Sequence, residues 1–266
     1  MNIRRSLKCE KRLQEVIGFL RPIDAGHKLI RVGCQDSDGG YLIPDDFEGI
    51  GACFSPGVSK MADFEKDMVK RGISCYLADG TVNKAPISDK SIHFTKKNLA
   101  KENSDNKDMS FWQKLFRSKP QEMRLDTWMN QHSYDGDLIL QIDIEGYEYE
   151  VFDSIGDKTL NKFRIIVAEF HDLGNLLTYQ RHSKGSIIHK VFKKLAKNFS
   201  VVHIHPNNAN PSHLWGEYEV PNLLEVTFLR KDRIHSQKPV KTFPHPLDRD
   251  NVNGHPKLVL PKCWYK

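Results

Sequence analysis

The stretch that decides the fold is residues 138–152, LILQIDIEGYEYEVF. Apolar side chains run almost without a break from position 138 to 144, which predicts a strand buried on both faces. Gly146 permits a sharp turn after this strand. Val151, Phe152 and Ile155 then give the next segment the apolar stripe of a helix. A buried strand that leads directly into a helix is typical of an open α/β sheet.

Polar side chains interrupt this strand at every second position, at Gln141, Asp143 and Glu145, so all three are expected on one face. Acidic groups at the carboxyl end of a central parallel strand lie where open α/β sheets bind ligands. The alternative is an exposed strand end with two solvated carboxylates. Because Asp143 stands between two isoleucines, its carboxylate needs a hydrogen-bond donor, a cation or a substrate nearby.

Composition describes a globular chain of 266 residues, 39% hydrophobic and 28% charged, which suits one large domain. The apolar runs are too short to span a bilayer, and the N-terminus MNIRRSLKCEKR lacks the apolar region of a signal peptide. The five cysteines are scattered and form no CxxC pair, so neither a zinc site nor a disulfide framework is predicted. A reducing, cytoplasmic location is the simpler expectation.

The net charge of +6 is spread along the chain. Nucleic-acid binding is not favoured, because no basic tract has aromatic residues interleaved with it. A small-molecule or glycan substrate, including a phosphate-bearing one, fits this charge equally well. The sequence leaves the oligomeric state open.

The chain divides into three predicted parts. Residues 1–27 contain an amphipathic helix, and residues 28–230 form the main domain. Residues 101–124 read as an inserted lid or surface loop that shapes the acceptor site, with a solvated excursion as the alternative. Residues 231–266 are rich in proline and predict an extended tail packed on the domain.

A nucleotide-type βαβ unit is predicted between Gly57 and Asp79. An acid at the end of the second strand of such a unit accepts hydrogen bonds from ribose hydroxyls. The loop SPGVS at residues 55–59 lacks the three glycines of a pyrophosphate site, and Asp63 and Glu65 would compete with a phosphate at the helix start. A nucleoside without phosphates, such as S-adenosylmethionine, therefore fits better than a dinucleotide.

Two later strands also end in polar groups. Residues 164–171, RIIVAEFH, place Glu169 and His171 on one face, and residues 199–205 do the same for His203 and His205. A last strand at 222–229 follows without a helix of useful length, which predicts an antiparallel hairpin at one edge of the sheet. The expected fold is a doubly wound, mostly parallel seven-stranded α/β sheet, Rossmann-like and of the class I methyltransferase plan.

Several motifs in fixed order extend this interpretation. They are RVG (31–33), DGGY (38–41), FSPGVSKMADFE (54–65), AD (78–79), LD (125–126), IDIEGYE (142–148), HIHPNN (203–208), PN (221–222) with Glu225, and PHPLD (244–248). With them the sequence resembles the FkbM-like family of class I methyltransferases. The resemblance implies S-adenosylmethionine as methyl donor and O-methylation of sugars. On these motifs the expected donor-binding residues are Tyr41, Ser55, Gly57, Val58, Asp79 and Asp143.

A sugar hydroxyl is too weak an acid to ionise unaided near pH 7, so methyl transfer to it needs a base or a metal. Asp143, Glu169 and His171 are expected at adjacent strand ends, where they would hold Mg²⁺ or Mn²⁺. Alternatively, His171 or His205 acts as the base without a metal. The candidate catalytic residues are therefore Asp143, His171 and His205, and the alternative for each histidine is a structural hydrogen bond.

The leading hypothesis is an S-adenosylmethionine-dependent O-methyltransferase acting on a sugar hydroxyl of a glycan or a nucleotide-linked sugar. An NAD(P)-dependent oxidoreductase is the second hypothesis, because the Asp79 spacing suits it. A third is a non-catalytic methyltransferase-like domain that binds a glycan or RNA.

Overall fold

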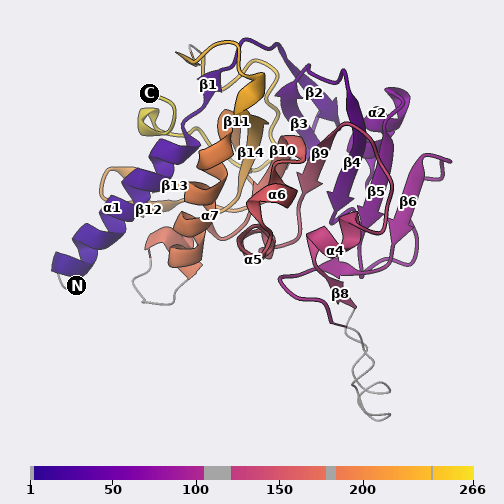
Figure 1. Ribbon diagram of the computed structural model, residues 1–266. Coiled ribbons are helices and arrows are strands. Elements are labelled where there is room, and N and C mark those ends of the chain that lie inside the picture. The colour runs from indigo at the N-terminus through magenta and orange to yellow at the C-terminus, as the bar shows by residue number, and fades with distance from the viewer. Residues whose placement is uncertain (1–2, 105–120, 178–183, 241) are drawn as a thin grey trace.

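A seven-stranded sheet forms the centre of the molecule, in the order β11-β14-β10-β9-β4-β5-β6 (Figure 1). The computed structural model describes residues 3–104, 121–177, 184–240 and 242–266. The strands of this sheet are β4 (Ile50–Pro56), β5 (Ser74–Ala78), β6 (Ile92–Thr95), β9 (Asp137–Ile142), β10 (Phe163–Phe170), β11 (Phe199–Pro206) and β14 (Leu224–Arg230). The strands from β6 to β10 pair in parallel, whereas β14 is antiparallel to both β10 and β11.

This topology confirms the predicted α/β class and the class I methyltransferase plan. The chain enters the sheet at β4, builds outward through β5 and β6, and then returns to β9 on the other side of β4. The carboxyl ends of β4 and β9 therefore flank the topological switch point, where open sheets bind ligands. The predicted hairpin of β11 and β14 lies at one edge, with the antiparallel strand β14 inside β11.

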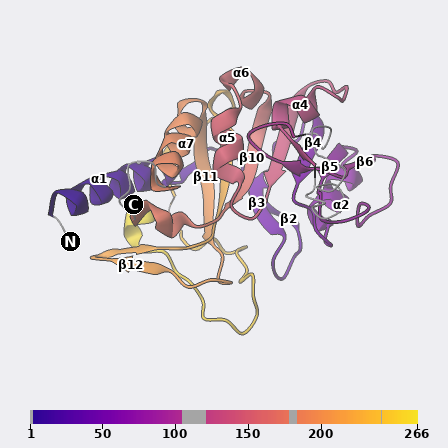
Figure 2. The same ribbon diagram turned by 90° about the horizontal axis from the view of Figure 1, so that it is seen from below.

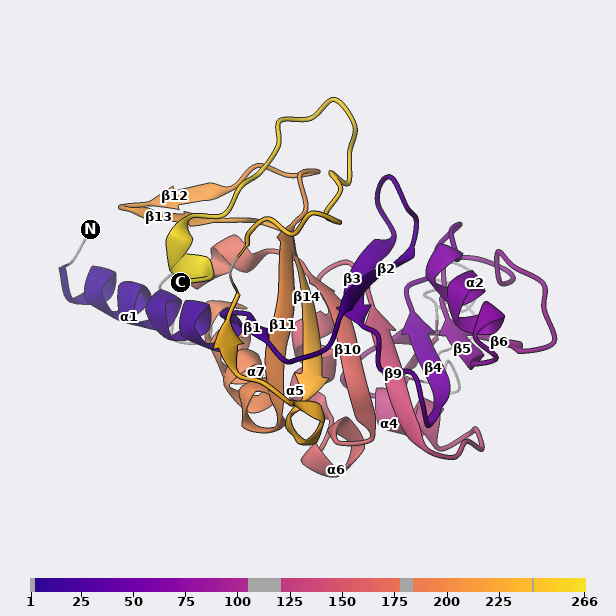
Figure 3. The ribbon, with the colours of Figure 1, turned by 90° about the horizontal axis from the view of Figure 1, so that it is seen from above.

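Helices and a small hairpin cover the two faces of the sheet (Figures 2 and 3). One face packs against α1 (Ile3–Leu20), α4 (Leu125–Met129), α5 (Glu148–Ser154), α6 (Asp157–Leu160) and α7 (Lys184–Asn198). The other packs against α2 (Asp63–Lys70) and the antiparallel pair β2 (Leu29–Gly33) and β3 (Gly40–Pro44). Every residue of β10 is buried, as its apolar run predicts for a strand covered on both faces.

The remaining elements are short and lie mainly at the ends of the sheet. They are β1 (Ile23–Asp24), β7 (Asn98–Leu99), β8 (Glu122–Met123), η2 (Leu173–Leu177), β12 (His213–Trp215), β13 (Tyr218–Val220), η3 (Lys231–Arg233), β15 (Lys238–Pro239) and η4 (Lys262–Trp264). β15 pairs with β1, and the buried Trp264 donates its indole N–H to the Glu219 carbonyl at 2.9 Å. β15 and Trp264 therefore contact earlier parts of the chain, and the predicted division into three parts, with its packed tail, stays a prediction.

Two further expectations concern the predicted insertion and membrane-spanning segments. Most of the predicted insertion at 101–124, including its apolar residues Phe111, Trp112, Leu115 and Phe116, lies outside the described residues. Across the described segments, we find no helix that combines the length and the apolar character needed to cross a membrane.

A buried side chain of β14 helps to fix the β2–β3 hairpin to the sheet. Thr227 of β14 donates its hydroxyl to the Leu42 carbonyl of β3 at 2.7 Å, and its side chain is fully enclosed. This contact matters for function because the hairpin carries Asp38 and Tyr41 to the carboxyl end of the sheet.

We expect Thr227→Val to destabilise the protein by about 1–2 kcal/mol, because the substitution keeps the shape of the side chain but removes the donor to a buried carbonyl. Urea unfolding monitored by circular dichroism measures this change. Thr242→Val, at an exposed position of the tail, is the matched control and should leave the midpoint unchanged. Equal midpoints for the Thr227 variant and the parent would contradict the role of this hydrogen bond.

Candidate active site

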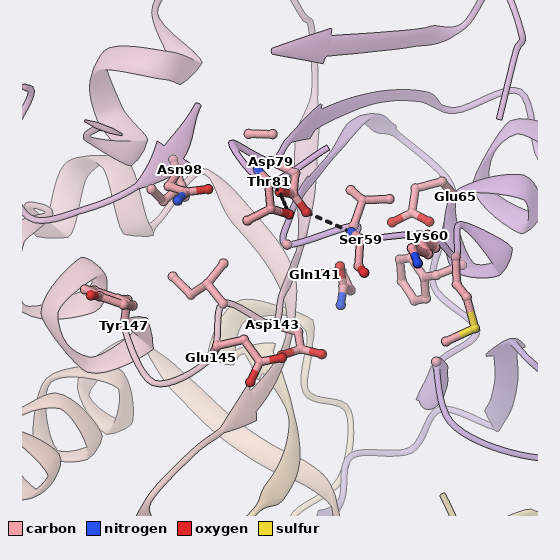
Figure 4. Close-up of a pocket in the computed structure, with 18 of the residues that line it drawn as sticks. Ser59, Lys60, Glu65, Asp79, Thr81, Asn98, Gln141, Asp143, Glu145 and Tyr147 are labelled. Carbon is pink, nitrogen blue, oxygen red and sulfur yellow. Dashed lines mark hydrogen bonds between the residues drawn. The ribbon is translucent and has the colours of Figure 1, made fainter. Parts of the chain in front are cut away.

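A cavity of about 720 Å³ opens at the carboxyl ends of β4, β5 and β9, at the switch point of the sheet. Figure 4 shows Asp79 and Thr81 on one side of this cavity and Asp143 and Glu145 on the opposite side. Five of the six predicted donor-binding residues line it: Tyr41, Gly57, Val58, Asp79 and Asp143. The volume lies within the range of sites for cofactor-sized ligands.

Ser55 is the exception, because it lies beneath the cavity instead of lining it. Its side chain is fully buried and its hydroxyl donates to Gln141 Oε1 at 2.6 Å. The same hydroxyl makes a close contact with the Glu65 carboxyl group. Burial raises the pKa of Glu65, so a protonated Glu65 can donate to Ser55. Ser55 therefore holds in place the side chains of Gln141 and Glu65, which both line the cavity.

Position 57 requires glycine, because a side chain there would collide with the end of β9. Its φ is +90°, and a Cβ at this position would lie 1.6 Å from the backbone oxygen of Asp143. The loop after β4 can approach the end of β9 only because this side chain is absent. Gly57 thus sets the cavity's shape by bringing two strand ends together.

Asp79, at the end of β5, holds the loops on its side of the cavity. One carboxylate oxygen, Oδ2, accepts a hydrogen bond from the Ser59 backbone N–H at 2.8 Å. The other, Oδ1, accepts from the Thr81 backbone at 2.7 Å and from the Thr81 hydroxyl at 2.6 Å. A carboxylate oxygen accepts two hydrogen bonds, so Oδ2 retains capacity for a ligand hydroxyl. Asp79 therefore combines a loop-ordering role with the position of the predicted ribose contact.

On the opposite side, a tight turn follows β9 and is organised by Glu148. Glu145 and Gly146 both adopt positive φ angles, of 56° and 96°. The fully buried carboxylate of Glu148 accepts hydrogen bonds from the backbone N–H groups of Ile144 and Gly146, at 3.0 and 3.1 Å. Glu148, the first residue of α5, is not among the site residues that the sequence predicts.

Glu148 also orients His171. The Nδ1 atom of His171 lies 3.1 Å from Glu148 Oε1, which leaves Nε2 directed at Asp143 Oδ1, 3.8 Å away, and at Glu145 Oε2, 3.5 Å away. Because Glu148 is an acceptor, the geometry favours the proton on Nδ1. His171 thus has one nitrogen fixed by a buried carboxylate and the other facing two acidic side chains.

Burial and the charged groups around His171 shift the pKa values of Asp143 and His171. Burial raises the pKa of Asp143 to about 7, with the neighbouring His171 opposing the shift and Glu148 and Glu145 adding to it. Burial alone would lower the pKa of His171, but the hydrogen bond to Glu148 and the surrounding carboxylates outweigh it and raise the pKa to about 9. Strongly perturbed groups at the edge of a cavity are candidates for acid–base chemistry.

The three predicted metal ligands do not form one group. Asp143 and His171 gather with Glu145, their ligand atoms all within 4.8 Å of one another, while Glu169 gathers with Asp38 and Glu225. The alternation expected along residues 164–171 stops early, because β10 ends at Phe170 and Asp172 has a positive φ of 55°. His171 consequently turns toward Glu148 instead of staying beside Glu169.

His205, the other predicted catalytic histidine, lies on β11 and does not line the cavity. Its Nδ1 is 3.8 Å from Asp248 Oδ2 of the tail, and His203 Nε2 is 3.0 Å from Oδ1 of the same carboxylate. Both histidines are buried under the C-terminal tail. The structure therefore brings Asp143 and His171 together as candidates for chemistry and separates His205 from them.

The described lining of the cavity is strongly acidic. It contains a single lysine, Lys60, and seven acidic side chains: Asp38, Asp63, Glu65, Asp79, Glu122, Asp143 and Glu145. Such a lining favours a ligand that carries positive charge and disfavours a pyrophosphate, which would add negative charge beside these groups.

The sheet order and the ligand cavity at its switch point define a class I methyltransferase fold. Residues 69–183 match the family model described as the methyltransferase FkbM domain. This match covers less than half of the chain and confirms the resemblance found in its motifs. The matched stretch contains Asp79, Asp143, Glu148 and His171, whereas the β2–β3 hairpin and the tail lie outside it. No curated protein sequence matches the chain.

Proposed function

We propose that this methyltransferase transfers the methyl group of S-adenosylmethionine to a hydroxyl oxygen of a sugar, in a glycan or a nucleotide-linked sugar. The observation that carries the donor assignment is the acidic cavity at the switch point. S-adenosylmethionine has a sulfonium and an ammonium cation, which acidic walls attract, and no phosphate. An NAD(P) cofactor would place its pyrophosphate among seven acidic side chains. The sugar acceptor rests on the FkbM resemblance.

The residues present fit this donor. Asp79 ends β5, the position from which an acid accepts hydrogen bonds from ribose hydroxyls. Asp143 and Glu145 place negative charge on the opposite wall (Figure 4), which suits the cationic part of the donor. When bound, the donor supplies a methyl group on a positively charged sulfur. The protein must then hold the acceptor oxygen in line and remove its proton.

His171 contributes to proton removal in one of two ways, as the base itself or as a ligand of a catalytic metal, and the metal is the route we propose. Glu148 fixes its Nδ1, as a carboxylate does in catalytic triads, and Nε2 is left to accept the hydroxyl proton. A divalent cation held by Asp143, Glu145 and His171 is the second way to activate the hydroxyl. The geometry suits this alternative as well, because metal-binding histidines commonly donate their other N–H to a carboxylate. The two routes predict different responses to chelation.

Isothermal titration calorimetry with S-adenosylmethionine, S-adenosylhomocysteine and NAD⁺ tests the donor. We expect both sulfur compounds to bind and NAD⁺ to give no heat. Turnover is then followed as S-adenosylhomocysteine formation over a panel of nucleotide sugars and glycans, with mass spectrometry of the products. Binding of NAD⁺ in place of S-adenosylmethionine would overturn the proposal in favour of an oxidoreductase. Donor binding without methylation of any panel member would favour a non-catalytic domain.

We expect Asp79→Ala to weaken S-adenosylmethionine binding by about 2–3 kcal/mol, or roughly 30- to 150-fold, through the loss of a charged ribose contact. Calorimetry measures the dissociation constant. Part of the loss can come from the loop, because Asp79 also accepts the Ser59 N–H. Thr81→Val keeps the carboxylate while removing one of its internal hydrogen bonds, so it should weaken binding much less. An unchanged constant for Asp79→Ala would refute the assignment.

A further inference from the structure

A row of ionisable side chains crosses the antiparallel edge of the sheet. Glu225 of β14 is the register partner of Glu169 on β10 and of His205 on β11. Directly opposed residues on neighbouring strands point to the same face, so the three side chains stand next to one another. All three are buried, with exposures of 4% for Glu169, 5% for Glu225 and 8% for His205. The row lies beside Asp143, because Ala168, which precedes Glu169, pairs with Ile142.

Two segments distant in sequence close over this row. Asp38, in the turn between β2 and β3, brings its carboxylate within 4.8 Å of those of Glu169 and Glu225. Asn251, in the tail, donates its side-chain amide to Glu225 Oε1 at 2.6 Å and to Asp38 Oδ1 at 2.9 Å. The hairpin, the sheet and the tail therefore meet at one small group of oxygen atoms (Figure 3 shows the hairpin and the tail converging on this side of the sheet).

Two basic side chains, His205 and Arg31, favour the charged form of Glu225 from a distance. Within the described ranges, no lysine or arginine forms an ion pair with Asp38, Glu169 or Glu225. Burial raises the pKa of Glu225 to about 7, with the neighbouring His205 and Asn251 opposing the shift. Burial and the charge of Asp143 also hold the pKa of Glu169 well above its ordinary value. Three carboxylates assembled in this way need a proton or a cation.

Unsatisfied polar atoms beside the group point to a missing ligand. Neither ring nitrogen of His205 has a partner within hydrogen-bond distance in the described part of the chain, although the residue is more than nine-tenths buried and Asp248 Oδ2 lies 3.8 Å from Nδ1. Asn251 Oδ1 is also buried without a hydrogen-bond partner among the described residues. The amide nitrogen of the same side chain donates to Asp38 and Glu225. Buried polar atoms without partners are rare, and each needs an explanation.

We propose that Asp38, Glu169 and Glu225 hold a divalent cation, with the side-chain oxygen of Asn251 completing the site after a half-turn of its amide. Carboxylate and amide oxygens are ligands for Mg²⁺, Ca²⁺ and Mn²⁺. The cation ties the β2–β3 hairpin and the C-terminal tail to the sheet. It is separate from the group of Asp143, Glu145 and His171, and it does not depend on the proposed methyl transfer.

Mn²⁺ binding tests this proposal in a variant whose other candidate metal group, Asp143, Glu145 and His171, has lost its two carboxylates. The parent for the test is the full chain with Asp143→Asn and Glu145→Gln, in which Asp38, Glu169 and Glu225 remain intact. Free Mn²⁺ is measured by electron paramagnetic resonance during a titration. We expect one Mn²⁺ to bind to the parent and to raise its melting temperature. Adding Glu225→Gln should weaken this binding at least about tenfold and remove the stabilisation.

A second variant keeps the test valid if Glu225→Gln fails to fold. Asp38→Asn changes a ligand in a partly exposed turn and should also weaken Mn²⁺ binding at least about tenfold. Circular dichroism in EDTA establishes that each variant is folded before titration. The proposal is overturned if the parent binds no Mn²⁺, or if folded variants at Glu225 and Asp38 bind it as tightly as the parent.

Discussion

Replacing His171 with glutamine is expected to lower the turnover number by about 10²- to 10⁴-fold and to change donor binding little. The reason is geometric. Glu148 holds Nδ1 at 3.1 Å, so Nε2 is the nitrogen left to receive a proton at the edge of the cavity. His171 itself does not line the cavity that the donor would fill. Steady-state kinetics at saturating donor, together with calorimetry, separates loss of chemistry from loss of binding.

His93→Gln is the matched control, because His93 is an exposed histidine of β6 that does not line the cavity. It should retain full turnover. If His171→Gln also retained full turnover, His171 would be neither the base nor a required metal ligand, and the site as we describe it would be wrong.

The pH dependence of the turnover rate distinguishes a catalytic base from a histidine with only a structural role. A base must be neutral, so in the absence of a metal the rate should rise with pH toward the His171 pKa of about 9. The Glu148 hydrogen bond and charge help to raise that pKa. Glu148→Gln, at a positioning residue, should therefore move the rise in rate to lower pH. A profile that does not move would show that the titration of His171 does not control the rate.

The local sequence patterns predicted the central part of the fold correctly. The apolar run before Asp143 forms β9, and the fully buried β10 follows the run in residues 164–171. The absence of a long helix between the last two strands identified the antiparallel β14, which distinguishes this sheet from an ordinary dinucleotide-binding one. These features are readable because strand burial and chain reversal leave periodic signals over a few residues.

The arrangement of the site could not be read in the same way. Period-two alternation placed Glu169 and His171 together, but it holds only while the strand continues, and β10 ends at Phe170. Asp38 and Asn251 come from the hairpin and the tail, 213 positions apart, and meet only through tertiary packing. Glu148 looked like an ordinary residue of a helix start, although it is fully buried and bonded to His171.

Removal of metal with excess EDTA is expected to abolish turnover, and Mg²⁺ or Mn²⁺ should restore it. Asp143, Glu145 and His171 offer two carboxylates and one imidazole within 4.8 Å, and Asp143 Oδ1 is buried without a hydrogen-bond partner among the residues described. A divalent cation would relieve the crowding of these carboxylates and lower the pKa of a bound hydroxyl. Protons compete with the metal for Asp143, whose pKa is about 7, and for His171, whose pKa is about 9, so metal binding should strengthen as the pH rises from below neutrality to about 9.

Asp143→Asn shows which of the two acidic groups is responsible. It removes a ligand charge beside His171 and leaves Asp38, Glu169 and Glu225 unchanged, so a cation at that second group would still bind. We expect this variant to stay inactive at every concentration of Mg²⁺ or Mn²⁺ while its Mn²⁺-dependent stabilisation persists. If no metal takes part in catalysis, chelation should leave turnover intact at temperatures well below unfolding. Turnover should then be lost only when His171 is replaced. Full activity in excess EDTA, after bound ions have been removed, would decide for the metal-free base.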